Sequence, residues 1–181
     1  SASIHVHGLT KGAFDPTVKP LLDLWGFGPV SPGNKARRPP DLQAVKHVLE
    51  CVGLYKVDAS EPDRPRKIDP RVQMDFGGVA KGYALDQIAE ILSQHGIDDF
   101  LVDIGGDILA SGTSLEGRAW RIGVNRPDPD AAWDDVLMVL HIRDKAVVTS
   151  GDYRRFFLHD ERLYGHVLDP RSGLPAQSAV A

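Results

Sequence analysis

The stretch DFGGVAKGYALDQIAEILSQHGIDDFLVDIGGDILA, residues 75–110, decides the fold class because it changes from a helical to a strand-like pattern. Apolar residues recur at helical spacing over 79–95, and Gly96 follows as a helix stop. Beyond this glycine the apolar residues form two short runs, 100–104 and 108–110, separated by a Gly-Gly-Asp turn. We therefore expect a long helix followed by two strands.

The residues upstream predict shorter elements separated by loops. Leucines and a tryptophan within 21–25 fit one or two helical turns, and Asp41 is placed to cap a helix over 42–52. The Pro- and charge-rich segment 59–71 is typical of a hairpin or surface loop, and the alternation in 72–76 predicts a short strand.

The residues downstream predict mainly strands. Apolar runs at 120–124, 136–142 and 146–149 extend the sheet, and 156–158 with 163–168 form a further hairpin. Helices in the first half and strands in the second indicate an α+β fold, with a mixed or antiparallel sheet flanked by helices.

Composition restricts the class of protein. The 181 residues carry 21 Lys and Arg against 25 Asp and Glu, a net charge of −4, so we expect no nucleic-acid partner. The 18 glycines and 13 prolines indicate many turns rather than disorder, because 42% of residues are hydrophobic. Cys51 is the one cysteine, which excludes an internal disulfide and a cysteine metal site.

The segment from Asp75 to Gly82 joins the expected strand 72–76 to the long helix. Gly77 and Gly78 allow close approach of a ligand, and the amides at a helix N-terminus favour an anion, to which Lys81 adds positive charge. The alternative is a glycine turn beside a solvated lysine. The spacing is not that of a phosphate-binding P-loop.

Three further segments combine glycine with polar side chains. The carboxylates Asp103 and Asp107 flank Gly105-Gly106 and suit a cation or sugar hydroxyls, although a tight hairpin is the simpler interpretation. Segments 149–154 and 166–173 place hydroxyl, carboxylate and basic groups beyond strand ends. His166 is a candidate general base, with a structural or surface histidine as the alternative.

The order of these motifs resembles the ApbE family of FAD:protein FMN transferases. The resemblance rests on six blocks: GAFDPTV at 12–18, LWGFG at 24–28, DFGGVAKGYA at 75–84, VDIGGD at 102–107, TSGDY at 149–153 and HVLDPRSG at 166–173. It implies an ApbE-like, T-fold-like core within a single flavin-transferase domain over 1–181.

The resemblance also implies an activity. Family members split FAD and attach its FMN half to a Thr or Ser hydroxyl of a target flavoprotein through a phosphoester, releasing AMP and requiring Mg²⁺. Members are often exported to the periplasm or cell envelope and held by a lipid anchor, although a cytoplasmic location stays open. The alternatives are an FAD pyrophosphatase that yields FMN and AMP, and a non-catalytic FAD-binding protein.

The resemblance assigns roles to residues by matching position. His166 is the expected base for the target hydroxyl, with Asp169 near it, and the Gly78 carbonyl is the expected metal ligand. Asp107 and Arg154 match orienting positions. The residues expected to contact FAD are Ala13, Phe14, Asp15, Asp75, Lys81, Ser150, Gly151, Asp152 and Leu168.

The family pattern extends beyond both ends of this sequence. Family members have an earlier segment that contributes to the FAD pocket, and an Asp-x-x-x-Thr pair after the last block that holds the metal. We therefore expect the chain to be the central part of a longer domain. We also expect it to bind Mg²⁺ poorly and to be an incomplete transferase, because Mg²⁺ needs six well-placed oxygens.

Overall fold

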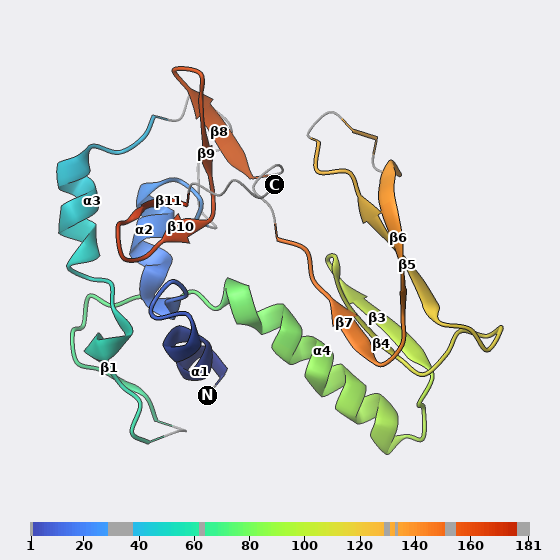
Figure 1. Cartoon of the computed structure of the whole chain (residues 1–181). Coiled ribbons are helices and arrows are strands. Elements are labelled where there is room, and N and C mark those ends of the chain that lie inside the picture. Colours follow the sequence, from blue (N-terminus) through green and yellow to red (C-terminus); the bar gives the residue numbers. More distant parts are fainter. Residues whose placement is uncertain are drawn as a thin grey trace. The chain divides into compact units, whose positions relative to one another are not determined.

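The computed structural model describes residues 2–28, 38–61, 64–128, 131–132, 134–150 and 155–176 (Figure 1). All strand pairs in these ranges are antiparallel, and together with the helices they confirm the α+β prediction. The chain divides into two compact units, one of Ser1–Gly78 with Asp152–Ala181 and one of Val79–Gly151. The α-helices are α1 (Ala2–Leu9), α2 (Lys19–Leu24), α3 (Leu42–Leu49) and α4 (Gly77–Gln94).

The first unit is built around α2 and α3. Asp41 caps α3 by accepting a hydrogen bond from the Ala44 amide, as predicted. Asp15 caps the 3-10 helix η1 (Pro16–Val18), which leads directly into α2. The hydrophobic core of this unit consists of Leu21, Trp25, Phe27, Val45, Val52, Phe157 and Leu168.

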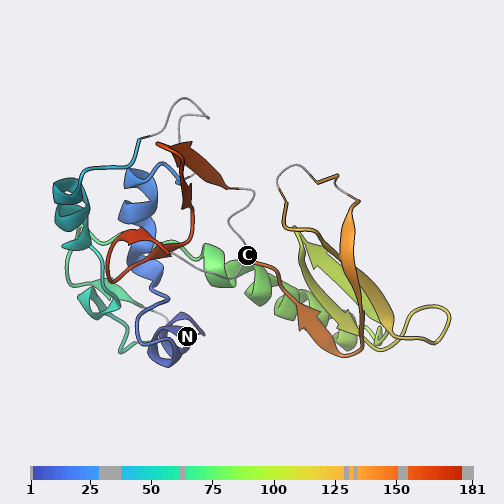
Figure 2. The same cartoon turned by 45° about the horizontal axis from the view of Figure 1, so that its top comes forward.

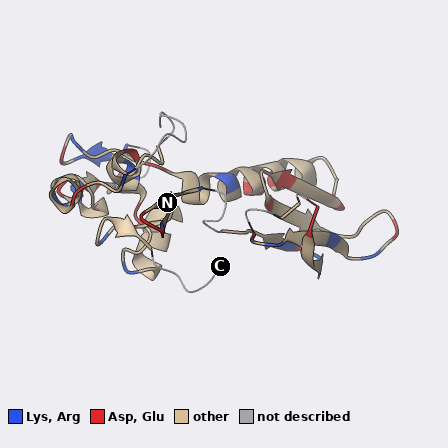
Figure 3. Cartoon of the chain, turned by 90° about the horizontal axis from the view of Figure 1, so that it is seen from above, with Lys and Arg blue, Asp and Glu red and all other residues tan. Residues whose placement is uncertain are grey.

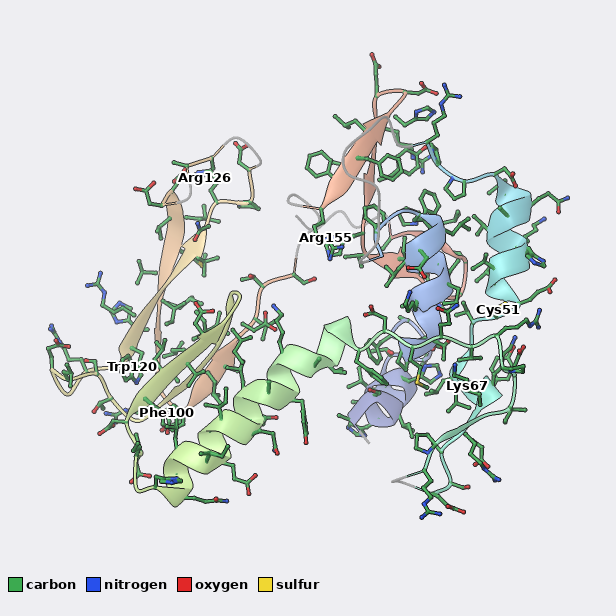
Figure 4. All side chains as sticks on the ribbon, turned by 180° about the vertical axis from the view of Figure 1, so that it is seen from behind. Cys51, Lys67, Phe100, Trp120, Arg126 and Arg155 are labelled. Atoms are coloured by element: carbon green, nitrogen blue, oxygen red, sulfur yellow. The ribbon has the colours of Figure 1, made fainter. Side chains whose placement is uncertain are left out.

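Short hairpins complete the first unit. The expected hairpin near the C-terminus is β8 (Phe156–His159) with β9 (Arg162–Gly165), and β10 (Leu168–Asp169) pairs with β11 (Leu174–Pro175). Of the two structures expected for the Pro-rich segment 59–71, a hairpin or a surface loop, the hairpin is closer. Its strand β2 (Arg66–Lys67) lies in the segment, and its partner β1 (Val57–Asp58) lies just before it. Figure 4 shows the half-buried Cys51 and the exposed Lys67 in this unit.

Three sequence-based predictions about element boundaries are wrong. Residues 72–76 are not a strand, because the Asp75 amide bonds to the Pro16 carbonyl at 2.7 Å instead of to a ladder. Helix α3 ends at Leu49, three residues before its predicted end, and α4 begins at Gly77 rather than Val79. The two glycines are thus the first residues of α4 and do not form a separate turn.

The second unit contains most of α4 and two antiparallel sheets (Figure 2). One sheet has the order β3 (Phe100–Ile104), β4 (Asp107–Ser111) and β7 (Lys145–Val147). The other pairs β5 (Trp120–Asn125) with β6 (Val136–Ile142). The buried core of the second unit contains Ala110, Ile122 and Ile142, which come from both sheets.

The Gly-Gly segment between β3 and β4 is a tight hairpin turn. Gly105 and Gly106 have φ of 58° and 88°, which L-residues with side chains rarely adopt. The Asp103 carboxylate accepts a hydrogen bond from the Gly106 amide at 2.8 Å, which stabilises the turn. The simpler of the two interpretations of this motif is therefore confirmed.

Charged residues of both signs lie on the same elements. Along α4, Lys81 is followed by Asp86 and Glu90, and Figure 3 shows both colours on this helix. Among the described helices, none is long and apolar enough to span a bilayer.

Candidate functional site

A pocket in the first unit brings together residues from three distant segments of the chain. Its volume is about 200 Å³, and it is lined by Ala13, Phe14, Asp15, Val18, Leu22, Asp75, Gly78, His166, Val167, Leu168 and Pro170. Seven of the residues predicted from the sequence are in this set: Ala13, Phe14, Asp15, Asp75, Gly78, His166 and Leu168. Motifs as far apart in the sequence as Ala13 and Leu168 therefore meet at one place.

Asp15 forms the buried part of the pocket wall, with 6% of its surface exposed. Its Oδ1 accepts hydrogen bonds from the Thr17 amide at 2.8 Å and from the Thr17 hydroxyl at 2.6 Å. Its Oδ2 accepts one from the Leu54 amide at 3.0 Å. Because these bonds satisfy the carboxylate within the protein, Asp15 fixes the shape of the loop that carries the pocket.

The start of α4 forms another part of the wall. The Asp75 carboxylate accepts a hydrogen bond from the Gly77 amide at 2.8 Å, which satisfies the first amide of the helix. A Cβ at Gly78 would lie 3.0 Å from Cε2 of Phe14, so the phenylalanine ring rests directly on this turn. Close approach, and not an unusual φ, makes glycine the residue that fits here without displacing the Phe14 ring.

His166 and Leu168 contribute the third part of the wall. The His166 amide donates to the Arg155 carbonyl at 3.1 Å, and the Arg155 side chain donates to the Phe27 carbonyl at 2.8 Å (Figure 4). The half-buried His166 ring lies edge-on to Phe27, with centroids 6.3 Å apart. Leu168 is buried in the core, which anchors this segment of the pocket wall.

Asp169 lies on a different pocket from His166. Its carboxylate accepts two side-chain hydrogen bonds from Arg171, at 2.9 and 2.8 Å, and these bonds hold the pKa of Asp169 below its usual value. It lines a pocket of about 490 Å³ with Trp25 and Tyr164. The carboxylate thus stabilises its own turn, and the expected catalytic role of Asp169 stays a prediction.

Lys81 is not a freely solvated lysine. Its ammonium donates to the Asp107 carboxylate at 2.6 Å and to the Gly105 carbonyl at 3.3 Å. Lys81 and the exposed Ser150 belong to the second unit, so their predicted contacts with the cofactor stay predictions. The predicted residues Gly151, Asp152 and Arg154 lie outside the described residues.

The described residues do not fit a magnesium ion. Within the described ranges there is no group of three or more His, Cys, Asp or Glu that could hold a metal. Gly78 is in the first turn of α4, where its carbonyl accepts the regular helical hydrogen bond and the helix dipole disfavours a cation. Since Mg²⁺ needs six oxygens, these groups alone do not form a site.

Two residues near the pocket were missed in the sequence. Nδ1 of His7 lies 2.9 Å from the Phe14 carbonyl and 3.7 Å from Oδ2 of Asp15, and the Thr10 hydroxyl accepts from the Phe14 amide at 3.0 Å. Their spacing of three residues would have placed them on one helix face, but α1 itself was not predicted.

Comparison with known proteins supports the resemblance over the whole sequence. The model of the ApbE family matches residues 1–181. A FAD:protein FMN transferase of Vibrio cholerae is 35% identical over 178 residues, covering 98% of this chain and 52% of the relative. That of Haemophilus influenzae is 34% identical over 180 residues, covering 99% and 51%. The chain therefore spans about half the length of these curated relatives.

Solved structures show the same fold. The crystal structure of the ApbE protein of Thermotoga maritima superposes with a TM-score of 0.82 at 37% identity, covering 97% of this chain and 55% of that one. The apo form of the flavinyl transferase ApbE of Pseudomonas stutzeri gives a TM-score of 0.80 at 35% identity, covering 97% and 52%.

Proposed function

The chain belongs to the ApbE family, and we propose that the protein is an FAD:protein FMN transferase. It would move the FMN half of FAD onto a Thr or Ser hydroxyl of a target flavoprotein and release AMP. The observation that carries the proposal is the single pocket that gathers Ala13, Phe14 and Asp15 with Asp75 and His166.

The size and lining of the pocket suit one ring system of FAD. Its volume of about 200 Å³ is below the roughly 300–1,000 Å³ of a complete small-molecule site. Phe14, Val18 and Leu22 offer apolar contact, which favours a planar ring, and the rest of the dinucleotide would extend beyond the pocket.

The start of α4 suits the diphosphate of FAD. The amides of its first turn create a partial positive charge. The Gly77 amide is bonded to Asp75, and the exposed Gly78 leaves the rest of the turn accessible to an anion. A diphosphate bound there would bring the phosphorus of the FMN half close to the pocket that holds His166.

His166 would act as the general base. The hydroxyl oxygen of the target forms a bond to the phosphorus of the FMN half, and its proton passes to the His166 imidazole. The bond between this phosphorus and the AMP oxygen breaks, and AMP leaves with the electron pair. Mg²⁺ would neutralise charge on the diphosphate when bound. Because the described residues do not fit the ion, none of the steps assigned to this chain involves it.

Three products distinguish the proposal from its alternatives. The full-length protein is incubated with FAD, Mg²⁺ and a candidate flavoprotein subunit, and the products are separated. Flavin fluorescence on the subunit in a denaturing gel is the expected result and shows transfer. Free FMN with AMP would instead show hydrolysis, and intact bound FAD would show storage, so either result alone would overturn the proposal.

A substitution at His166 tests the base. His166→Gln should lower turnover by about 10²- to 10⁴-fold, the usual contribution of a general base, while FAD binding is retained. The exposed His141 of the second unit is the matched control, and His141→Gln should leave turnover unchanged. Equal turnover in His166→Gln and the wild type would remove His166 as the base.

A further inference from the structure

We propose that His7 of α1 and Thr10, which follows α1, are positioning residues that hold the Phe14 backbone and thereby fix the Phe14 ring in the wall of the pocket. Neither residue lines the pocket itself. The proposal rests on the proposed function in one respect, that the ligand of this pocket is FAD.

Both polar backbone groups of Phe14 are bonded to side chains of α1 or the residue following it. The Phe14 amide donates to Oγ1 of Thr10 at 3.0 Å, and the Phe14 carbonyl accepts from Nδ1 of His7 at 2.9 Å. Because a carbonyl can only accept, Nδ1 of His7 must carry the proton. The two bonds hold the peptide units before and after the Phe14 Cα, so together they define the orientation of this residue's backbone.

The loop needs these bonds because it is irregular. Phe14 is in neither a helix nor a strand, so no ladder satisfies its backbone. Lys11 and Gly12 have φ of 50° and 81°, which turn the chain back so that the Gly12 amide reaches the His7 carbonyl at 3.0 Å. This turn returns Phe14 to the side of α1 that presents His7.

The Thr10 hydroxyl is itself oriented. It donates to the Val6 carbonyl at 2.8 Å, one helical turn earlier. Its proton is therefore directed along the helix, and a lone pair is left to accept from Phe14. Thr10 thus links the backbone of α1 to the Phe14 amide through its hydroxyl.

The ring of Phe14 has little freedom on its other side. The contact with Gly78, where a Cβ would be only 3.0 Å from Cε2 of the ring, places the ring against α4. A small rotation of the Phe14 peptide would move the ring into this turn or away from the pocket. The position of the ring therefore depends on the two bonds from α1.

The first experiment measures FAD binding by the full chain through quenching of flavin fluorescence. We expect His7→Ala and Thr10→Val to weaken FAD binding about five- to tenfold each, the equivalent of one lost hydrogen bond. His7→Asn keeps a donor at the position of Nδ1 and Thr10→Ser keeps the hydroxyl, so both should bind FAD as the wild type does. His5→Ala, an exposed histidine on the same helix, is the control and should have no effect.

A Phe14→Ala background separates positioning from general stability. If His7 and Thr10 act through the ring, His7→Ala and Thr10→Val should not weaken FAD binding further once the ring is absent. An equal loss of affinity in both backgrounds would overturn the proposal, as would a failure of the Asn and Ser variants to restore binding. If His7→Ala does not fold, His7→Gln places its donor nearer the Nε2 position and should show the same loss.

A measurement without FAD separates this proposal from the proposed function. The aromatic resonances of Phe14 in the NMR spectrum should shift in His7→Ala and Thr10→Val and return in His7→Asn and Thr10→Ser. Unchanged resonances in the first pair would overturn the positioning role. If the resonances shift as expected but the wild type does not bind FAD, the proposed function fails and the positioning role stands.

Discussion

At the scale of single residues, the lack of a side chain at Gly78 leaves room for the Phe14 ring. Alanine normally stabilises a helix relative to glycine by about 0.5–1 kcal/mol, but here its methyl group would lie 3.0 Å from the Phe14 ring. We expect Gly78→Ala to displace this ring and weaken FAD binding, with little net change in stability because the two effects oppose each other. Isothermal titration with FAD measures the affinity, and urea unfolding measures the stability.

Gly82 provides the matched control within the same helix. Nothing lies within 4 Å of a Cβ at this position, so Gly82→Ala should raise the free energy of unfolding by about 0.5–1 kcal/mol. FAD affinity should be unchanged. If Gly78→Ala also stabilised the protein and bound FAD normally, the tight contact with Phe14 would not control the pocket.

Residues of the pocket could be predicted from the order of the sequence motifs. The hydrogen-bond and ion-pair partners of the predicted site residues could not. Asp75 and His166 were selected from the sequence and line the same pocket. The ion-pair partner of Lys81 is Asp107, 26 positions away, and no local sequence pattern predicts this pair. The partner of Asp169 is Arg171, only two residues on, so a local ion pair could have been considered there.

At the scale of elements, the Lys81–Asp107 pair connects α4 to the turn between β3 and β4. Asp107 is 7% exposed, and losing its cation would leave a nearly buried carboxylate with one partner fewer. Since Lys81 is itself partly solvated, we expect Lys81→Met to lower the free energy of unfolding by only about 1–2 kcal/mol.

Urea unfolding measures the contribution of the Lys81–Asp107 pair to stability. The exposed Lys145→Met is the control and should change stability by less than about 0.5 kcal/mol. In the double variant Lys81→Met with Asp107→Leu, the loss should be smaller than the sum of the single losses, because both remove the same interaction. Strict additivity would show that the pair does not stabilise the second unit.

The sequence Asp-Pro-Arg forms the same turn twice. In both turns the arginine donates from its amide and its guanidinium to the aspartate two residues before, in Asp69–Arg71 and in Asp169–Arg171. These bonds lower the pKa of Asp69 to about 2 and lower that of Asp169. A depressed pKa means that stabilisation is present above the unfolded value of 3.8 and is lost as pH falls through the folded value.

Arg171→Leu should therefore destabilise the protein near neutral pH but not in acid. The stability difference from the wild type should be constant above about pH 5 and shrink below about pH 4 as Asp169 is protonated. Urea unfolding across this range measures it, with the exposed Arg118→Leu as a variant of equal charge change. A difference that persisted at low pH would assign the effect of Arg171 to packing instead.

Elements with strong periodicity were predicted correctly, and elements that depend on distant contacts were not. Helix α4 and the hairpin β8–β9 follow from apolar spacing and turn residues. The alternation of 72–76 has the pattern of a strand but no ladder, since the Asp75 amide bonds to Pro16 in a distant segment. Helix α1 contains Gly8 and several poor helix formers, and its hydrogen bonds to the Phe14 loop are invisible in the sequence.

At the scale of the whole molecule, the motifs divide between two compact units. The pocket belongs entirely to the first unit, and the Lys81 and Ser150 motifs belong to the second. The sequence suggested one flavin-transferase domain because the order of motifs runs through both units. Motif order reports shared ancestry, whereas compactness depends on contacts, so the two descriptions need not coincide.

Hydrogen exchange with and without FAD would show which motifs meet the ligand in solution. Ligand at 100 times its Kd stabilises the bound state by about 2.7 kcal/mol, so amides that it covers should exchange far more slowly. We expect slower exchange in 12–18, 75–82 and 165–169, because these segments form the pocket and the start of α4. The exposed β6 strand is the internal control and should not change. Slowing at 105–107 and Ser150 as well would support the predicted contacts in the second unit, whereas slowing in β6 alone would place FAD elsewhere and contradict the pocket.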